Sequence, residues 1–193
     1  TRVQFACQHP FTVPDPDAKP WDSISVHARL NRTGDGADAV IEGDPMVRST
    51  YPDVEIPEVS VHEFLFGSVE EERLDTVAII DGRSGETTTY RRLIEQIDSF
   101  AGALASRGVD TETRVGLLCP NIPAFATVFH GILRAGAPAT TINSLYTPHE
   151  IAGQLSDAGA TWLITVSPLL PQGQEAAAAV GIDAEHLIVL AGA

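Results

Sequence analysis

Short apolar runs alternate with helical stretches along the second half of the chain, a pattern typical of a parallel sheet. Four runs are apolar almost without interruption, as expected for strands that are covered on both faces. They span residues 115–119, 138–142, 162–166 and 187–190. Each gap of roughly 20 residues has room for one helix and its loops, as a right-handed βαβ crossover needs. The pattern therefore predicts an α/β fold with an open, mostly parallel sheet and flanking helices.

The gaps between these strands carry helical signals. Residues 122–135 are apolar nearly all round, which predicts a deeply buried helix. Thr147, followed by a proline and by Glu150, forms a capping box that predicts a helix start, and Gly159 is a suitable helix end. A third, Ala-rich helix is expected over residues 168–180.

Upstream of this alternation, the sequence predicts one short helix and a β-hairpin. Ser60, with Glu63 three residues later, is a capping box that starts the helix. The apolar positions of 77–80 form one strand, residues 83–85 turn the chain, and 87–89 form the returning strand.

A long amphipathic helix is expected to follow this hairpin directly, with Thr89 as its N-cap and Gly108 as its stop. Its apolar positions fall on one face at helical spacing. They are Tyr90, Leu93, Ile94, Ile97, Ala101 and Leu104.

The first 47 residues differ from the rest, because prolines at four of the first 20 positions break any long element. Alternation over residues 24–30 suggests a strand, and Asp35-Gly36 a hairpin turn. We therefore divide the chain into an irregular or hairpin extension, 1–47, and an α/β part, 48–193.

The composition of the chain argues against several classes of protein. The chain of 193 residues has a formal net charge of −14, and this argues against nucleic-acid binding, which needs clustered Lys and Arg. It has no run of 18 apolar residues and no basic start followed by an apolar stretch, so neither a membrane span nor a secretory signal is predicted. The expected location is the cytoplasm.

Common catalytic motifs are missing from the sequence. Gly34-Asp35-Gly36 lacks the third glycine of a dinucleotide-binding turn. Lys19 is the only lysine and lies in a Pro-rich stretch, so neither a P-loop nor a Schiff-base lysine is supported. A G-x-S-x-G nucleophile elbow is absent as well. No residue is therefore assigned as catalytic, cofactor-binding or metal-binding.

Individual titratable residues are interpreted structurally. The six histidines show no metal-binding i, i+4 pair, and Cys7 and Cys119 show no zinc spacing. His130 is expected to be a hydrogen-bonded core histidine, His149 an exposed residue at a helix start, and Cys119 a buried inert thiol. Glu70–Glu72 are expected to be a solvated surface at a helix end.

Two long stretches resemble the N-terminal region of adenylate-forming ligases, and most closely the 4-coumarate-CoA and fatty-acyl-CoA ligases. They are TTYRRLIEQIDSFAGALASRGVDTETRVGLLCPNIPAF and FHGILRAGAPATTINSLYTPHEIAGQLSDAGATWLIT. RSTYPDVEIPEVSVHEFL, ahead of them, resembles the opening of plant-type coumarate ligases, so the resemblance covers about residues 48–190. The chain departs from the family at Arg92, where Glu is frequent, and at Asn143-Ser144, where Asn-Pro is frequent.

The resemblance implies a reaction and its cofactors. Such enzymes join a carboxylic acid to ATP, with magnesium, to form an acyl-adenylate, and then transfer the acyl group to coenzyme A. The family's phosphate loop, its nucleotide and acyl pockets and its catalytic lysine lie beyond residue 193, so this chain alone is expected to be inactive and to bind no cofactor. Asn143 and Tyr146 are expected near the carboxyl edge of the sheet, where ligands of α/β proteins bind.

Two other functions stay open at this point, a non-catalytic α/β binding module and an adenylation domain of a peptide synthetase. As an incomplete part of a ligase, the chain is expected to expose apolar surface and to self-associate.

Overall fold

The structure is a computed structural model that describes residues 56–190. Residues 58–190 belong to one compact unit. The predicted strand at 24–30, the turn at Asp35-Gly36 and the boundary at residue 47 lie outside the described residues. The predicted parallel sheet lies inside them and is confirmed.

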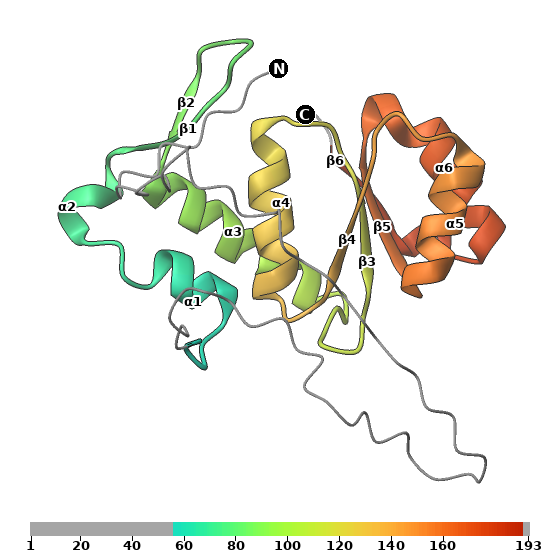
Figure 1. Ribbon diagram of the computed structural model, residues 1–193, viewed down its shortest axis with the longest axis horizontal. Coiled ribbons are helices and arrows are strands. Elements are labelled where there is room, and N and C mark those ends of the chain that lie inside the picture. The colour runs from blue at the N-terminus through green and yellow to red at the C-terminus, as the bar shows by residue number, and fades with distance from the viewer. Residues whose placement is uncertain (1–55, 191–193) are drawn as a thin grey trace, which may run out of the picture. The chain divides into compact units, whose positions relative to one another are not determined.

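A four-stranded parallel sheet is the centre of the described chain (Figure 1), and its strand order is β4-β3-β5-β6. The strands match the predicted runs to within one residue. They are β3 (Val115–Leu118), β4 (Ala139–Ile142), β5 (Trp162–Val166) and β6 (Leu187–Leu190). Val115 is aligned with Ala139 on one side and with Trp162 on the other.

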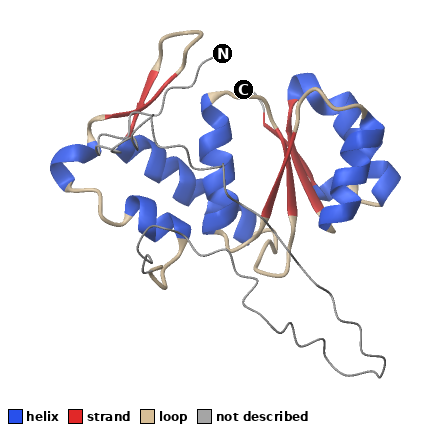
Figure 2. Ribbon diagram, viewed as in Figure 1, coloured by secondary structure: helices blue, strands red, loops and turns tan. Residues whose placement is uncertain are grey.

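The sheet is preceded by an antiparallel hairpin of two short strands, β1 (Val77–Ile80) and β2 (Thr87–Thr89), which Figure 2 shows apart from the parallel strands. The predicted turn between them is confirmed. Its backbone is held by Asp81, whose Oδ1 accepts from the Arg83 amide at 2.8 Å.

Six α-helices and two short 3₁₀ turns complete the described elements. The helices are α1 (Val61–Phe66), α2 (Glu71–Leu74), α3 (Tyr90–Ala105), α4 (Pro123–Arg134), α5 (Pro148–Ala158) and α6 (Leu170–Val180). The 3₁₀ turns are η1 (Ser167–Leu169) and η2 (Ala184–His186).

Three helices start at the predicted capping residues. Ser60, Thr89 and Thr147 each accept a hydrogen bond from the amide three residues later. At Thr147 the Glu150 side chain returns the bond, so this capping box is complete, whereas at Ser60 only the serine half is present. Gly159 ends α5 in the left-handed conformation, at φ 63°, which costs glycine nothing.

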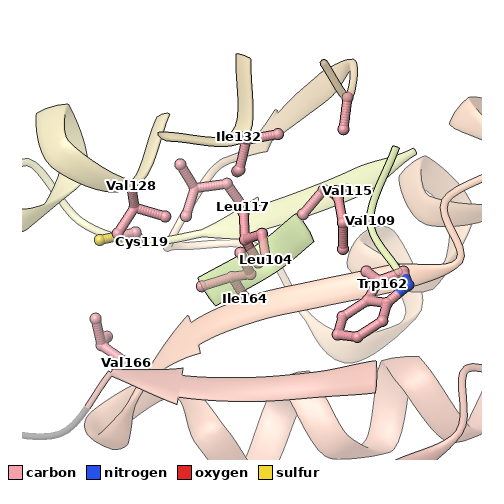
Figure 3. Close-up of a cluster of buried hydrophobic side chains, with 11 residues drawn as sticks. Leu104, Val109, Val115, Leu117, Cys119, Val128, Ile132, Trp162, Ile164 and Val166 are labelled. Atoms are coloured by element: carbon pink, nitrogen blue, oxygen red, sulfur yellow. The ribbon is translucent and has the colours of Figure 1, made fainter. Parts of the chain in front are cut away.

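Each face of the sheet is covered by a different pair of helices, with α3 and α4 on one face and α5 and α6 on the other (Figure 1). On the first face, Val128 and Ile132 of α4 point toward Leu117 of β3 (Figure 3). On the second face, Leu118 of β3 packs with Leu155 of α5. Strand β3 is fully buried as a result, which explains its uninterrupted apolar sequence.

Helices α3 and α4 lie close together because a glycine stands at their contact. A Cβ built on Gly131 of α4 would lie 2.7 Å from Cδ1 and 3.3 Å from Cβ of Phe100. A small residue there lets the Phe100 ring of α3 lie directly against the α4 backbone.

Three predictions about helices need correction. Helix α4 is not deeply buried all round, since Phe125 and Phe129 pack against the core cluster but stay partly exposed. The third crossover begins with η1, and α6 starts at Leu170 rather than at 168 because Pro168 opens a separate turn. Glu70–Glu72 are exposed as expected but stand at the start of α2, a four-residue helix that was not predicted.

The histidines and the cysteine have mixed outcomes. His149 is exposed and Cys119 is buried, as predicted. The prediction of a hydrogen-bonded His130 is wrong at Nδ1, which is buried and has no partner among the described residues. Aromatic rings surround it instead: Phe66 and Phe129 both lie edge-on to it with ring centroids 5.3 Å away.

The glycine at the α3–α4 contact gives a stability test. We expect Gly131→Ala to lower the free energy of unfolding by about 1–2 kcal/mol, because the added methyl group overpacks against Phe100. Gly102→Ala in α3 is the matched control: its added Cβ would meet nothing within 4 Å, so helix propensity should raise stability by up to about 1 kcal/mol. Urea unfolding followed by circular dichroism measures both, and an equal gain for the two variants would contradict the close contact.

Candidate functional site

The candidate site is a hollow at the carboxyl ends of β3 and β4. Since the two strands are parallel, the residues that follow them meet at the same edge of the sheet. The hollow has a volume of about 390 Å³. Its lining residues are Cys119, Pro120, Asn121, Phe125, Thr141, Ile142, Asn143 and Ser144.

The topology makes this edge the place where a ligand would bind. After β3 the chain continues into α4 on one face of the sheet, whereas after β4 and β5 it continues into α5 and α6 on the other face. Loops that leave neighbouring strands toward opposite faces open a crevice between them, and ligands of open α/β sheets bind in such crevices. Thr165 is buried within this edge and donates its Oγ1 hydrogen to the Leu118 carbonyl at 3.0 Å, which ties β5 to β3.

The turn after β4 is held by Asn143. Its Oδ1 accepts from the Leu145 amide at 3.0 Å, and its carbonyl accepts from the Tyr146 amide at 3.1 Å. Leu145 and Tyr146 are exposed beside it. The expected position of Asn143 is confirmed, while a contact of Asn143 or Tyr146 with a ligand stays a prediction.

Side chains from α5 and α6 fix the position of this turn. Gln154 donates from Nε2 to the Thr141 carbonyl at 2.9 Å, and Gln172 donates from Nε2 to the Ser144 carbonyl at 3.5 Å. At the start of α5, hydrogen bonds from Thr147 hold the pKa of the Glu150 carboxyl below its usual value, so the capping box persists through neutral pH.

The hollow is polar but uncharged. The amides of Asn121 and Asn143 and the hydroxyls of Thr141 and Ser144 donate and accept hydrogen bonds. Among the described residues, the one ionisable group that lines it is the Cys119 thiol, whose pKa burial raises to about 11. Since a thiol reacts as the thiolate, Cys119 is not a nucleophile at neutral pH. The hollow can bind a polar group, but its own side chains supply neither a base nor a cation.

Two arginines of the described chain are held in ion pairs and do not line the hollow. The guanidinium of Arg91 binds Asp75 and Glu71, and that of Arg134 binds Asp98. Between residues 56 and 190, no three His, Cys, Asp or Glu side chains come together where they could hold a metal ion. In the same range, no helix combines the length and the apolar character that a membrane span requires.

Sequence reasoning anticipated this edge of the sheet and Asn143, but not the other polar residues of the hollow. Asn121 and Thr141 were not singled out, and their position at the end of a strand is the one signal that could have found them. Thr165 reads as an ordinary strand residue, because its bond to β3 depends on two segments 47 residues apart.

Comparisons with known proteins agree with this architecture. A family model described as AMP-binding enzyme matches residues 66–191. The chain is 39% identical over 119 residues to a 4-coumarate–CoA ligase of Oryza sativa subsp. japonica, a match that covers 61% of this chain and 22% of the relative. It is 42% identical over 84 residues to a long-chain-fatty-acid–CoA ligase of Salmonella typhimurium, which covers 43% of this chain and 15% of that relative. The chain thus spans less than a quarter of the curated relatives it matches.

Two crystal structures of related enzymes have the same fold. A benzoate CoA ligase from Burkholderia xenovorans matches with a TM-score of 0.61 and 30% identity, over 68% of this chain and 26% of that one. An anthranilate CoA ligase in complex with anthranoyl-AMP matches with a TM-score of 0.57 and 29% identity, over 63% of this chain and 23% of that one. The predicted fold, the N-terminal part of an adenylate-forming ligase, is therefore confirmed.

The state of the Cys119 thiol is open to a direct measurement. In a Cys7→Ser chain Cys119 is the single thiol, and a pKa of about 11 against the usual 9.0 leaves about a hundredth of the thiolate near pH 8. We expect a chromogenic aromatic disulfide, whose reaction with a thiol is followed by absorbance, to react at least about 100-fold more slowly with the folded chain than with the same chain unfolded in guanidinium. Equal rates would contradict a buried, protonated thiol.

Proposed function

Because the chain belongs to the AMP-binding enzyme family, we propose that it is the N-terminal part of an acid–thiol ligase. The proposed enzyme joins a carboxylic acid to ATP, releases pyrophosphate, and passes the acyl group from the adenylate to coenzyme A. The observation that carries the proposal is the family match over residues 66–191, which includes every strand of the described sheet. The named relatives are CoA ligases, which favours coenzyme A over a peptide-synthetase carrier as the acceptor.

The described residues supply the frame of this enzyme rather than its chemistry. Transfer of an adenylyl group needs cations and backbone amides aimed at developing negative charge. Residues 56–190 contain no lysine, and the hollow at the carboxyl edge is lined by no charged side chain. Since the residues present do not fit ATP with magnesium, we propose that this part is inactive alone.

For the acid substrate of the proposed enzyme, the comparisons support two classes, aromatic acids and long-chain fatty acids. The relatives include enzymes named for aromatic acids and enzymes named for long-chain fatty acids. In the proposed enzyme, the hollow near Asn143 is a supporting wall of the ligand crevice, and the acid itself is selected outside the described residues. A cytoplasmic location stays a prediction.

The reaction is tested with the protein expressed from its whole natural reading frame. We expect ATP–pyrophosphate exchange that depends on an added acid, with 4-coumarate, benzoate and hexadecanoate as the panel, and acyl-CoA formation when coenzyme A follows. Reactions without acid or with a chelator are the controls, and the 193-residue chain alone should show no exchange. Exchange by the 193-residue chain, or none with any acid by the whole protein, would overturn the proposal.

We also propose that the 193-residue chain self-associates through the β6 edge. Strand β6 is the last strand in the described sheet, pairs on one side only, and is half-buried along its whole length. Beside it lies a hollow of about 690 Å³, lined by apolar residues such as Phe100, Ile188 and Leu190 and by polar ones such as Arg92 and Glu95. An unpaired apolar strand edge is a template for pairing with another chain.

Sedimentation velocity over a range of concentrations tests this association. We expect the 193-residue chain to form dimers or larger species, and Val189→Lys to weaken them about tenfold or more, since lysine on an edge strand opposes pairing. Val189 belongs to β6 but to none of the buried clusters, so the variant should still fold. Val59→Lys, at a half-exposed site ahead of α1, is the matched control. A wild-type chain that stays monomeric would sink the proposal without affecting the ligase assignment.

A further inference from the structure

The short helix α1 is held on α3 and α4 by a small aromatic cluster that contains two histidines. His62 of α1 is nearly buried, with 11% of its side chain exposed. Its ring centroid lies 5.3 Å from that of Phe66, which in turn lies 5.3 Å from that of His130 on α4. The Nδ1 atoms of both imidazoles are buried and have no hydrogen-bond partner among the described residues.

Few other contacts hold α1 in place. The helix has six residues, none of them fully buried, and Val61, Phe64 and Leu65 face solvent. A helix of this length has no stability of its own in water. Within the described part of the chain, Phe66 is the α1 residue that reaches the core, where it packs against a cluster from β1, α3 and α4. Docking of α1 therefore depends on the contacts of His62 and Phe66.

The charges around the two imidazoles come from each neighbouring helix. His62 Nε2 lies 3.8 Å from Oδ1 of Asp98 on α3, and the same oxygen accepts from Nε of Arg134 on α4 at 3.0 Å. Glu63, next to His62 on α1, is the remaining charge that acts on it. The titratable group that acts on His130 is His62 itself.

This arrangement favours neutral imidazoles while α1 is docked. Burial lowers the pKa of both histidines. Arg134 lowers the pKa of His62 further, Asp98 and Glu63 raise it in part, and His62 lowers the pKa of His130. When α1 detaches, both rings regain water and an ordinary pKa near 6.5, so the detached state binds more protons below that pH. Docking is thus fully favourable above about pH 6.5 and weakens as the pH falls.

We propose that α1 is a pH-dependent latch, docked on α3 and α4 at neutral pH and released when His62 and His130 are protonated. The aromatic cluster would then hold two imidazolium cations whose Nδ1 atoms have no hydrogen-bond partner among the described residues. Asp98, the carboxylate beside His62, already accepts a hydrogen bond from Arg134. Release requires that His62 and Phe66 leave their contacts, because the other α1 side chains are already exposed. This inference is independent of the proposed ligase activity.

Hydrogen–deuterium exchange of the whole 193-residue chain measures release directly. After correction for the intrinsic effect of pH on exchange, we expect amides 63–67 to lose about tenfold or more of their protection between about pH 7.5 and pH 5. Amides of β3 and β5 should keep theirs. Unchanged protection of α1, or a parallel loss in the sheet, would overturn a local latch.

Two charge substitutions separate titration from simple loss of packing. Asp98→Asn removes a charge that stabilises protonated His62 while α1 is docked, so the docked state tolerates protonation less and the release midpoint should move to higher pH. Arg134→Gln removes a charge that destabilises protonated His62 while α1 is docked, so the midpoint should move to lower pH. Both variants break the same Arg134–Asp98 ion pair, so a merely structural effect would shift both midpoints in one direction and contradict the proposal.

Removal of the titrating groups gives the final test. The double variant His62→Phe, His130→Phe keeps two aromatic rings in the cluster and should hold α1 protected at about pH 5. His149→Gln, at the exposed start of α5, is the matched control and should release α1 as the wild type does. A pH response that survives in the double variant would rule out these histidines as the switch.

Discussion

Burial of β3 on both of its faces is the constraint on which the other described elements depend. Its four residues are fully covered, with Val115 and Leu117 toward α3 and α4 and Leu118 toward α5. In a parallel sheet the crossover connections place helices on both faces, so an inner strand is buried on both of its faces. Strands and helices therefore alternate along the chain. The right-handed crossover, together with the order of the strands, sets the face of the sheet on which each helix lies.

The same alternation creates the hollow at the carboxyl edge. Since α4 leaves β3 toward one face and α5 leaves β4 toward the other, the loops that start these helices cannot close over the strand ends. Asn143, Gln154 and Gln172 hold one of these loops in place through its own backbone. The polar groups of this edge are thus used largely to shape it, which agrees with a frame that other parts of a larger enzyme complete.

Helices α3 and α4 have a second role, because they link the sheet to the hairpin and to α1. Phe100 and Gly131 bring the two helices together, and Phe66 enters the cluster that they form with β1. The histidines of the α1 contact sit at the margin of this cluster, where water is excluded but hydrogen-bond partners are few. A titratable imidazole at this position couples the attachment of α1 to the charge of the imidazole.

The sequence by itself determined the order and the type of the larger elements. Uninterrupted apolar runs, the Thr147 capping box and the Thr89 cap act over a few residues, so local patterns were enough to place β3 to β6, α3 and α5. It also excluded lysine chemistry, since Lys19 is the only lysine. The tertiary structure alone decided which face each helix covers, how Thr165 is tied to Leu118, and that Nδ1 of His130 has no hydrogen-bond partner among the described residues while its ring meets Phe66. These contacts join residues far apart along the chain. They form only when the chain folds, so a local sequence pattern does not predict them.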